Sequence, residues 1–340
     1  MTPLAVETIE SCLRLRNRLS GVGRHPDPWR HFGRGGLAEA EARCAAANRD
    51  LLAFVRPPKK ISVDNLTVSP ETRLRGPRVE TLRFDSPLPS GRPTNDRVQA
   101  RLYRPPRGEA LDRVVVFHHP IYQRHWALWE WFLSDVIARI PVVMMAAPYH
   151  FERLPPGEFP GEGICNPNPW RMFEAFRQWC WDERVLRQVV REHCGLEPVA
   201  AIGYSVGAFL TLLAAAAGSL TAPVVSIAST NRYAHGVTRG TIGRGIMEGM
   251  LRVGIDAGRL HKMTESVQLE RYAPRLRNHP VLYVYGKYDR VDPPPSLERL
   301  ERALRPTRVV RLDVGHATIM LRRERVMRET RSFLTDVGAL

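Results

Sequence analysis

The sequence predicts an α/β fold in which a mostly parallel, eight-stranded sheet carries helices on both faces. Two observations predict it. Short apolar runs alternate with longer helical segments at the spacing of βαβ units. In addition, the apolar run 199–202 passes through a glycine-flanked turn into a second apolar run, 208–217, which is the pattern of a strand that leads directly into a helix. A chain of 340 residues can bury the core that such a sheet needs.

The first 75 residues differ from the rest of the chain. Residues 1–75 show helical periodicity with a break at 26–36, so we expect an N-terminal helical extension. It forms either an accessory domain or an arm that lies over the main domain. Glu7 and several arginines come before any long apolar segment, so no secretory signal is expected and the predicted location is the cytoplasm.

The main domain is expected over residues 76–340, and its strands follow in chain order. The first two are joined by the turn-rich segment 86–93 and are expected to enter the sheet antiparallel. The eight expected strands are 79–84, 98–103, 113–117, 141–147, 199–202, 222–228, 280–285 and 308–312.

Helices are expected between these strands, at 126–137, 170–193, 208–217, 295–305 and 318–337. Two further segments are longer than plain connections. The Pro- and Gly-rich loop 148–169 is long enough to overhang a site. Residues 231–276 show helical periodicity between two strands, and an insertion at the carboxyl edge of a sheet usually forms a cap or lid.

Composition limits the classes of partner. The net charge of +15 is carried mostly by arginines spread over nearly every expected element, so a nucleic-acid partner is not expected. Residues 199–231 carry no charge, but Gly203, Gly207 and Pro223 divide them, so a membrane span is not expected. The five cysteines lack close pairing and are expected to be reduced thiols. A homodimer is left open.

A serine stands between two glycines on the turn between the fifth strand and its helix, in the order Gly203, Tyr204, Ser205, Val206, Gly207. Such a turn is sharp, and the residues two before and two after the serine must be small for the strand and helix backbones to approach. The turn also lifts the hydroxyl clear of the sheet. A glycine-flanked serine can equally close an ordinary turn, so a catalytic role depends on other residues.

A serine hydroxyl needs a base, normally a histidine that a buried carboxylate orients. Asp289 follows the apolar run 280–285, and His316 follows the run 308–312. Because the carboxyl ends of parallel strands share one edge of a sheet, Ser205, Asp289 and His316 are predicted to converge there. Asp292 is near enough to take the place of Asp289. Each residue alone could instead be a turn, cap or packed residue.

The order Ser205, Asp289, His316 is the order found in α/β-hydrolases. From about residue 79 to its C-terminus, the chain resembles a serine hydrolase of the α/β-hydrolase superfamily. The resemblance implies that residues 76–340 are a catalytic domain with a Ser-His-Asp triad and a small-molecule acyl substrate. No cofactor is expected.

The resemblance also implies an oxyanion hole with two N–H donors, one from Val206 and one from the loop after the third strand. That loop departs from the His-Gly-Gly-Gly pattern of many esterases, and Pro120 has no N–H to donate. The expected second donor is the backbone of Ile121 or Tyr122. The Tyr122 hydroxyl is a further candidate, although its ring could simply pack on the adjoining helix.

Four histidines, His118, His119, His125 and His150, lie near expected strand ends, as metal ligands often do. No Asp or Cys accompanies them at ligand spacing, so no metal is predicted. In the superfamily that the chain resembles, a histidine after the third strand is commonly structural.

The walls of the pocket are only partly predictable. Trp126, Trp129 and Trp131 would border the site if their helix faces it, and would otherwise pack in the core. The expected cap contains five arginines, which would suit a carboxylated or phosphorylated substrate or form a solvated face. They are Arg232, Arg239, Arg244, Arg252 and Arg259.

The sequence therefore predicts a serine hydrolase that cleaves a carboxylic ester or thioester through an acyl-enzyme intermediate. The same triad would serve an acyltransferase, a peptidase or a carbon–carbon bond hydrolase. A non-catalytic binding protein on the same scaffold is the remaining class, and Pro120 in the oxyanion loop is the feature that favours it.

Overall fold

The computed structural model describes residues 2–19, 23–70, 72–73, 77–106, 111–239 and 243–340. The strands in these residues are β1 Thr67–Val68, β2 Thr72–Arg73, β3 Arg78–Asp85, β4 Arg97–Arg104, β5 Arg113–His118, β6 Val142–Met145, β7 Glu197–Tyr204, β8 Val224–Ile227, β9 Val281–Gly286 and β10 Arg308–Leu312. They form one ten-stranded sheet in the order β1-β3-β4-β6-β5-β7-β8-β9-β10, and β2 pairs with β3.

All eight expected strands are present, as β3 to β10, but the predicted count of eight is wrong. The two additional strands, β1 and β2, pair antiparallel with β3. Each has only two residues, too few to show the alternation that identifies a strand in a sequence. Both lie in the segment 1–75, whose helices end at Val55.

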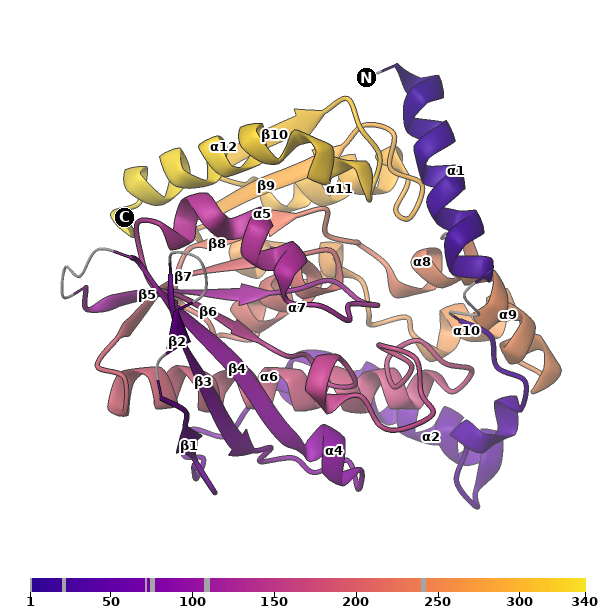
Figure 1. Cartoon of the computed structure of the whole chain (residues 1–340). Coiled ribbons are helices and arrows are strands. Elements are labelled where there is room, and N and C mark those ends of the chain that lie inside the picture. The colour runs from indigo at the N-terminus through magenta and orange to yellow at the C-terminus, as the bar shows by residue number, and fades with distance from the viewer. Residues whose placement is uncertain (1, 20–22, 71, 74–76, 107–110, 240–242) are drawn as a thin grey trace.

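The six strands β5 to β10 run parallel, whereas β3 and β4 are antiparallel to their neighbours. The carboxyl ends of β5, β7, β9 and β10 therefore meet at one edge of the sheet (Figure 1). The loops that follow these strands carry the residues in which sequence analysis placed the site.

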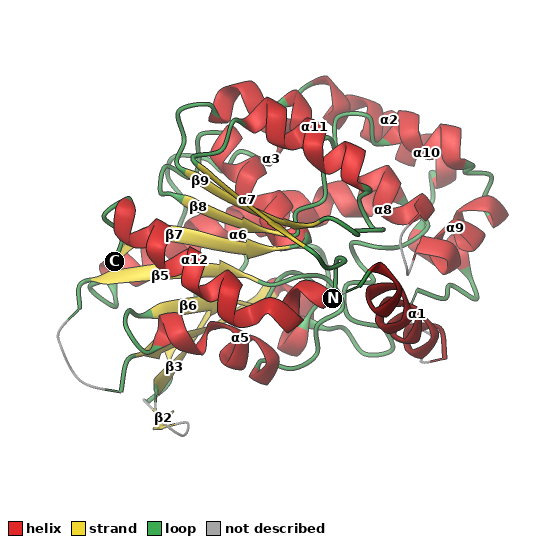
Figure 2. Cartoon of the chain, turned by 90° about the horizontal axis from the view of Figure 1, so that it is seen from above, coloured by secondary structure: helices red, strands yellow, loops and turns green. Residues whose placement is uncertain are grey.

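Helices cover both faces of the sheet, as expected. On one face lie α5 Ala127–Ile137 and α12 Arg323–Asp336, and on the other lie α6 Pro169–Glu192, α7 Val206–Ala216 and α11 Pro294–Leu304 (Figure 2). Successive residues of a strand point to opposite faces. Val114 and Val116 of β5 accordingly join the core under α6 and α7, whereas Val115 and Phe117 join the core under α5 and α12.

The N-terminal extension has two parts. Its helices α2 Gly36–Arg49 and α3 Leu51–Val55 pack on α6 and belong to the same hydrophobic core. Helix α1 Pro3–Leu19 instead stands beyond the carboxyl ends of the parallel strands, on the side of the molecule where helices of the segment 231–276 also lie (Figure 1). The extension thus contributes to both the core and the edge that carries the site.

The segment 231–276 is helical, as expected, although its residues 240–242 lie outside the described residues. It contains α8 Tyr233–Arg239, α9 Gly243–Arg252, α10 Ala257–Met263 and the 3₁₀ turns η3 Leu269–Arg271 and η4 Ala273–Leu276. The remaining short helical turns are η1 Pro28–His31, α4 Pro93–Asp96, η2 Phe151–Arg153 and η5 Thr318–Arg322. Across all the helices described, none is both long and apolar enough to cross a membrane.

Candidate active site

Ser205 lies on the sharp turn between β7 and α7, with φ 55° and ψ −119°. Residues with a side chain rarely adopt a positive φ, so this backbone is strained and needs support from its surroundings. The Ser205 N–H donates a hydrogen bond to the Ile227 carbonyl of β8 at 2.8 Å, which ties the turn to the neighbouring strand. The turn therefore holds the serine at the carboxyl edge of the sheet.

The two glycines that flank the turn have no room for a side chain. A Cβ atom at Gly203 would lie 2.5 Å from Ala208 Cα, and one at Gly207 would lie 2.3 Å from the His118 carbonyl oxygen. Both neighbouring atoms belong to the backbone and cannot swing away. The glycines thus allow β5, β7 and α7 to approach closely at the serine.

Gly207→Ala should lower the free energy of unfolding by about 2 to 3 kcal/mol, because a Cβ atom this close to the His118 carbonyl oxygen must displace backbone atoms. Gly236→Ala is the matched control. Its Cβ would meet only Val291 Cγ1, at 3.9 Å, in a helix that alanine favours, so we expect a change of about 1 kcal/mol or less. Urea unfolding measures both. Equal stability of the two variants would contradict this account of the turn.

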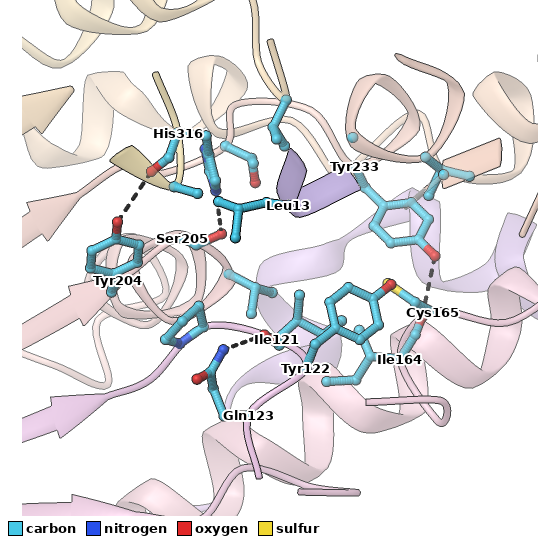
Figure 3. Close-up of a pocket in the computed structure, with 18 of the residues that line it drawn as sticks. Leu13, Ile121, Tyr122, Gln123, Ile164, Cys165, Tyr204, Ser205, Tyr233 and His316 are labelled. Atoms are coloured by element: carbon cyan, nitrogen blue, oxygen red, sulfur yellow. Dashed lines mark hydrogen bonds between the residues drawn. The ribbon is translucent and has the colours of Figure 1, made fainter. Parts of the chain in front are cut away.

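Ser205, His316 and Asp289 are brought together in one hydrogen-bonded series. Figure 3 shows its first bond, between Ser205 and His316. Ser205 Oγ lies 2.9 Å from His316 Nε2, and His316 Nδ1 lies 2.8 Å from Asp289 Oδ2. The carboxylate can only accept, so the proton between these two residues belongs to Nδ1 and leaves Nε2 free to accept from the serine hydroxyl. The series has the connectivity that serine activation requires.

The geometry distinguishes the two candidate acids. Asp289 is buried, and its second oxygen, Oδ1, accepts from the N–H groups of Val291 at 2.8 Å and Asp292 at 3.0 Å. Asp292 is buried as well, but its carboxylate accepts from the Asn231 N–H at the start of the cap. Asp289 is therefore the carboxylate that orients His316, and Asp292 anchors the cap to the same loop.

The pKa of His316 lies above the ordinary histidine value of 6.5. Burial alone would lower it, but the Asp289 carboxylate more than offsets this by its charge and its hydrogen bond, and Glu10 and Asp292 add to the upward shift. A protonated His316 cannot accept the serine proton. The rate of turnover should therefore be greatest at pH values above this pKa and should fall as the pH drops through it.

We accordingly expect the acidic limb of kcat/KM against pH to have its midpoint above 6.5. Stopped assays with a neutral ester, whose own ionisation does not change across the range, measure this. A midpoint well below 6.5, in protein whose fold is intact at that pH, would contradict the assignment of His316 as the base.

The structure distinguishes the candidate oxyanion donors. Val206 is the first residue of α7, so its N–H has no carbonyl partner within the helix and can point at a substrate oxygen. In the part of the chain that the structure describes, the Ile121 N–H also has no hydrogen-bond partner. Tyr122 is different, because its N–H already donates to His150 Nε2 at 3.1 Å. The prediction of a Tyr122 backbone donor is therefore wrong, and Ile121 remains.

The histidines around this loop hold backbone groups in place. His150 accepts from Tyr122 through Nε2, while its Nδ1 lies 2.8 Å from the Pro148 carbonyl oxygen. His119 bonds the Ala147 N–H at 3.0 Å and the Pro120 carbonyl at 2.6 Å. Burial lowers the pKa of both imidazoles, which keeps them neutral and suited to accept one bond and donate the other. His118 similarly accepts from the Trp179 indole at 3.1 Å.

Gln123 fixes the Ile121 peptide from the other side. Its side-chain amide donates to the Ile121 carbonyl at 2.9 Å (Figure 3). Its carbonyl oxygen accepts from the Trp129 indole N–H at 3.1 Å. Side chains thus hold the Pro120–Ile121 and Ile121–Tyr122 peptides of the loop after β5, although the loop lacks the glycines of the common esterase pattern.

A pocket of about 730 Å³ opens in front of Ser205. Its lining includes residues of the loop after β5, the loop before α6, the segment 231–276 and helix α1. Tyr122, Cys165 and Tyr233 converge on one wall, where the Tyr233 hydroxyl donates to the Ile164 carbonyl at 3.2 Å (Figure 3). Burial raises the pKa of the Cys165 thiol to about 11, so this thiol is protonated at neutral pH.

For two groups of side chains, the tryptophans of α5 and the arginines of 231–276, the sequence left open whether they face the pocket. Of the three tryptophans, only Trp129 lines the pocket; Trp126 stacks on Phe151 with ring centroids 4.2 Å apart, and Trp131 is half-exposed beneath the Arg323 guanidinium. The helix turns one face to the site, so residues at this spacing cannot all reach it.

The cap arginines mainly make internal bonds. Arg232 pairs with Glu270, Arg244 with Glu248 and Arg259 with Glu41, while Arg252 donates to the carbonyls of His25 and Pro26. Arg232 also lines the pocket. The side chain of Arg239 lies outside the described residues. Four of the five thus bond within the segment 231–276 or attach it to the N-terminal extension, a use that sequence spacing does not show.

The N-terminal extension contributes to the site in ways that no sequence motif predicts. Glu10 and Leu13 of α1 line the pocket, although no motif marks either residue. A further group, His25, His31 and Glu162, is the one set of at least three potential metal ligands within the described ranges. His25 Nδ1 and His31 Nε2 lie 3.0 Å apart as a hydrogen bond, and Arg30 pairs with Glu162.

Several solved structures are similar to this one. An acetyl xylan esterase from a Paenibacillus species has a TM-score of 0.59 and 13% sequence identity, with 87% of this chain and 95% of that chain covered. Acetyl xylan esterase 1 from a Thermoanaerobacterium species has a TM-score of 0.56 and 16% identity, with 86% and 98% covered. An acylaminoacyl peptidase from Pyrococcus horikoshii has a TM-score of 0.56 and 12% identity, with 77% of this chain but 42% of that chain covered. No protein-family model and no curated protein sequence matches this chain.

Proposed function

We propose that this chain, which has the α/β-hydrolase fold, is a serine hydrolase that cleaves carboxylic esters or thioesters through an acyl-enzyme intermediate. The observation that carries the proposal is the series from Ser205 through His316 to Asp289, placed on a strained turn that faces a pocket. A non-catalytic binding protein on this scaffold would gain nothing from the strained backbone at Ser205.

The proposed reaction has two stages. His316 Nε2 takes the proton of the Ser205 hydroxyl as Oγ attacks the carbonyl carbon, and Asp289 stabilises the imidazolium that forms. The N–H groups of Val206 and Ile121 would hold the developing oxyanion. His316 then protonates the leaving alcohol or thiol. A water molecule, deprotonated by the same imidazole, releases the acid and restores the serine.

The substrate is proposed to be a small acyl compound. A pocket of about 730 Å³ with largely apolar walls suits a neutral acyl group of several carbons. Residues 231–276 are proposed to form its cap within the catalytic domain 76–340, because six pocket residues come from this segment. They are Arg232, Tyr233, Gly236, Val237, Gly243 and Ile246. Two of the similar structures are named as esterases, which favours ester over amide cleavage.

Hydrolysis of a series of p-nitrophenyl esters, from acetate to dodecanoate, tests the proposal. We expect turnover with a maximum kcat/KM at an intermediate chain length, set by the depth of the pocket. An assay with added alcohols or amines as acceptors separates a hydrolase from an acyltransferase. If folded protein turns over none of the esters and transfers no acyl group, the proposal fails.

A further inference from the structure

The carboxylate of Glu10 reaches the loop that carries His316. Glu10 lies on α1, 307 positions before Ala317, yet its Oε1 accepts a hydrogen bond from the Ala317 N–H at 3.0 Å. The same oxygen lies 3.3 Å from the Thr318 nitrogen and 3.3 Å from the Thr318 hydroxyl. Glu10 is only 4% exposed, which is rare for a glutamate unless its charge has partners.

These contacts replace a missing helix cap. The turn η5 begins at Thr318, and the first N–H groups of a helical segment have no partner within it. A side-chain oxygen just before the helix usually accepts from them, but the residue there is Ala317, which has none. The Glu10 carboxylate supplies the acceptor from a distant helix, and its negative charge suits the amino end of η5.

The backbone on both sides of His316 is held by the same group. A Cβ atom at Gly315 would lie 2.4 Å from Glu10 Oε1, so the carboxylate packs directly on this glycine. The Gly315 N–H donates to the Thr318 hydroxyl at 2.8 Å. From β7, the Tyr204 hydroxyl donates to the His316 carbonyl at 3.1 Å (Figure 3). The imidazole therefore projects from a loop whose preceding and following residues both contact Glu10.

We propose that Glu10 is a positioning residue for His316, and that the N-terminal helix is thereby a working part of the active site. Glu10 fixes the loop so that Nε2 stays within reach of Ser205, and its charge favours the imidazolium that forms during catalysis. This inference rests on the proposed function. It gives the N-terminal extension a role in the reaction, in addition to its contacts with the core and cap.

The charged groups that face His316 are Asp289 and Asp292 from the loop after β9 and Glu10 from α1. Asp289 holds the imidazole directly, whereas Glu10 acts through charge and through the backbone of the loop. Replacing Glu10 by glutamine keeps an oxygen that can accept from Ala317 but removes the charge. The two effects can therefore be separated by substitution.

Three variants of the full chain test the inference. Glu10→Ala should lower kcat by about tenfold to a hundredfold, with a smaller effect on KM, because a misplaced base slows the chemical step. Glu10→Gln should keep most of kcat, but its acidic limb of kcat/KM should move to lower pH, since a positive His316 loses a favourable charge. Glu7→Gln is the control, because Glu7 lies on the same helix but is half-exposed and pairs with Arg290.

Hydrogen–deuterium exchange gives a readout that does not need turnover. The peptide containing Ala317 and Thr318 should exchange faster in Glu10→Ala than in the wild type or Glu7→Gln. If wild-type protein turns over esters and Glu10→Ala matches it in kcat and exchange, the inference is overturned. If Glu10→Ala does not fold, the pH profile of Glu10→Gln decides. The inference is overturned if the acidic limb of kcat/KM in Glu10→Gln coincides with that of the wild type. Wild-type protein without esterase activity contradicts the proposed function, and the exchange measurement then decides whether Glu10 holds the loop.

Discussion

Ser205→Ala should lower kcat for ester hydrolysis by about 10⁵- to 10⁶-fold, because the proposed acyl-enzyme forms only on this hydroxyl. The side chain is small and its turn is held through the backbone, so the variant should fold as the wild type does. Steady-state assays on the best p-nitrophenyl ester measure the loss, and circular dichroism checks the fold.

The matched control is Ser332→Ala, which removes an exposed hydroxyl on α12 that bonds Arg308 at 3.0 Å. Its turnover should equal that of the wild type. If Ser205→Ala kept more than about a hundredth of wild-type kcat, the nucleophile would be another group and the triad assignment would be wrong.

The second large effect is expected for the acid of the triad. Asp289→Asn should lower kcat by about 10⁴-fold, because an amide can donate to Nδ1 and would then place the imidazole proton on Nε2, facing the serine. Asparagine has nearly the same side-chain volume as aspartate, so the variant should keep its fold. Above the His316 pKa, raising the pH should not restore turnover, since the tautomer rather than the charge is at fault.

Asp292→Asn is the comparison that the structure makes informative. Asp292 accepts from the Asn231 N–H and does not bond His316, so its amide should keep kcat within about tenfold of the wild type. A larger loss for Asp292→Asn than for Asp289→Asn would mean that the two carboxylates exchange roles when substrate binds.

The sequence predicted the central strands β5 to β9 because they are largely buried and give nearly continuous apolar runs. β5 illustrates this, since Val114, Val115, Val116 and Phe117 are all buried, two under each layer of helices. The edge strands β1 and β2 give no such run, because each has two residues and the β1 pair is exposed.

The convergence of Ser205, Asp289 and His316 was predictable for a related reason. Each follows a strand whose end is marked in the sequence, and parallel strands end at one edge. The choice between Asp289 and Asp292 was not predictable, because three residues of loop decide which carboxylate turns toward the imidazole. The choice between Ile121 and Tyr122 depended in the same way on His150, which arrives from a different loop.

No sequence motif identifies Glu10 as part of this site. A glutamate in an amphipathic helix looks like any solvated charge, and its partners at Ala317 and Thr318 lie at the other end of the chain. Only the packing of α1 against the loop shows that its carboxylate is buried. The single hint in the sequence is Gly315, whose missing side chain leaves the space that Glu10 fills.

The central claim is that Ser205 is an activated nucleophile in the folded protein. Labelling with a fluorophosphonate, followed by intact mass measurement and peptide mapping, tests it without knowledge of the substrate. The account predicts one adduct per chain, located on Ser205, absent from Ser205→Ala and formed far more slowly in His316→Ala. Folded wild-type protein that takes up no label, or carries it on another residue, would contradict the account.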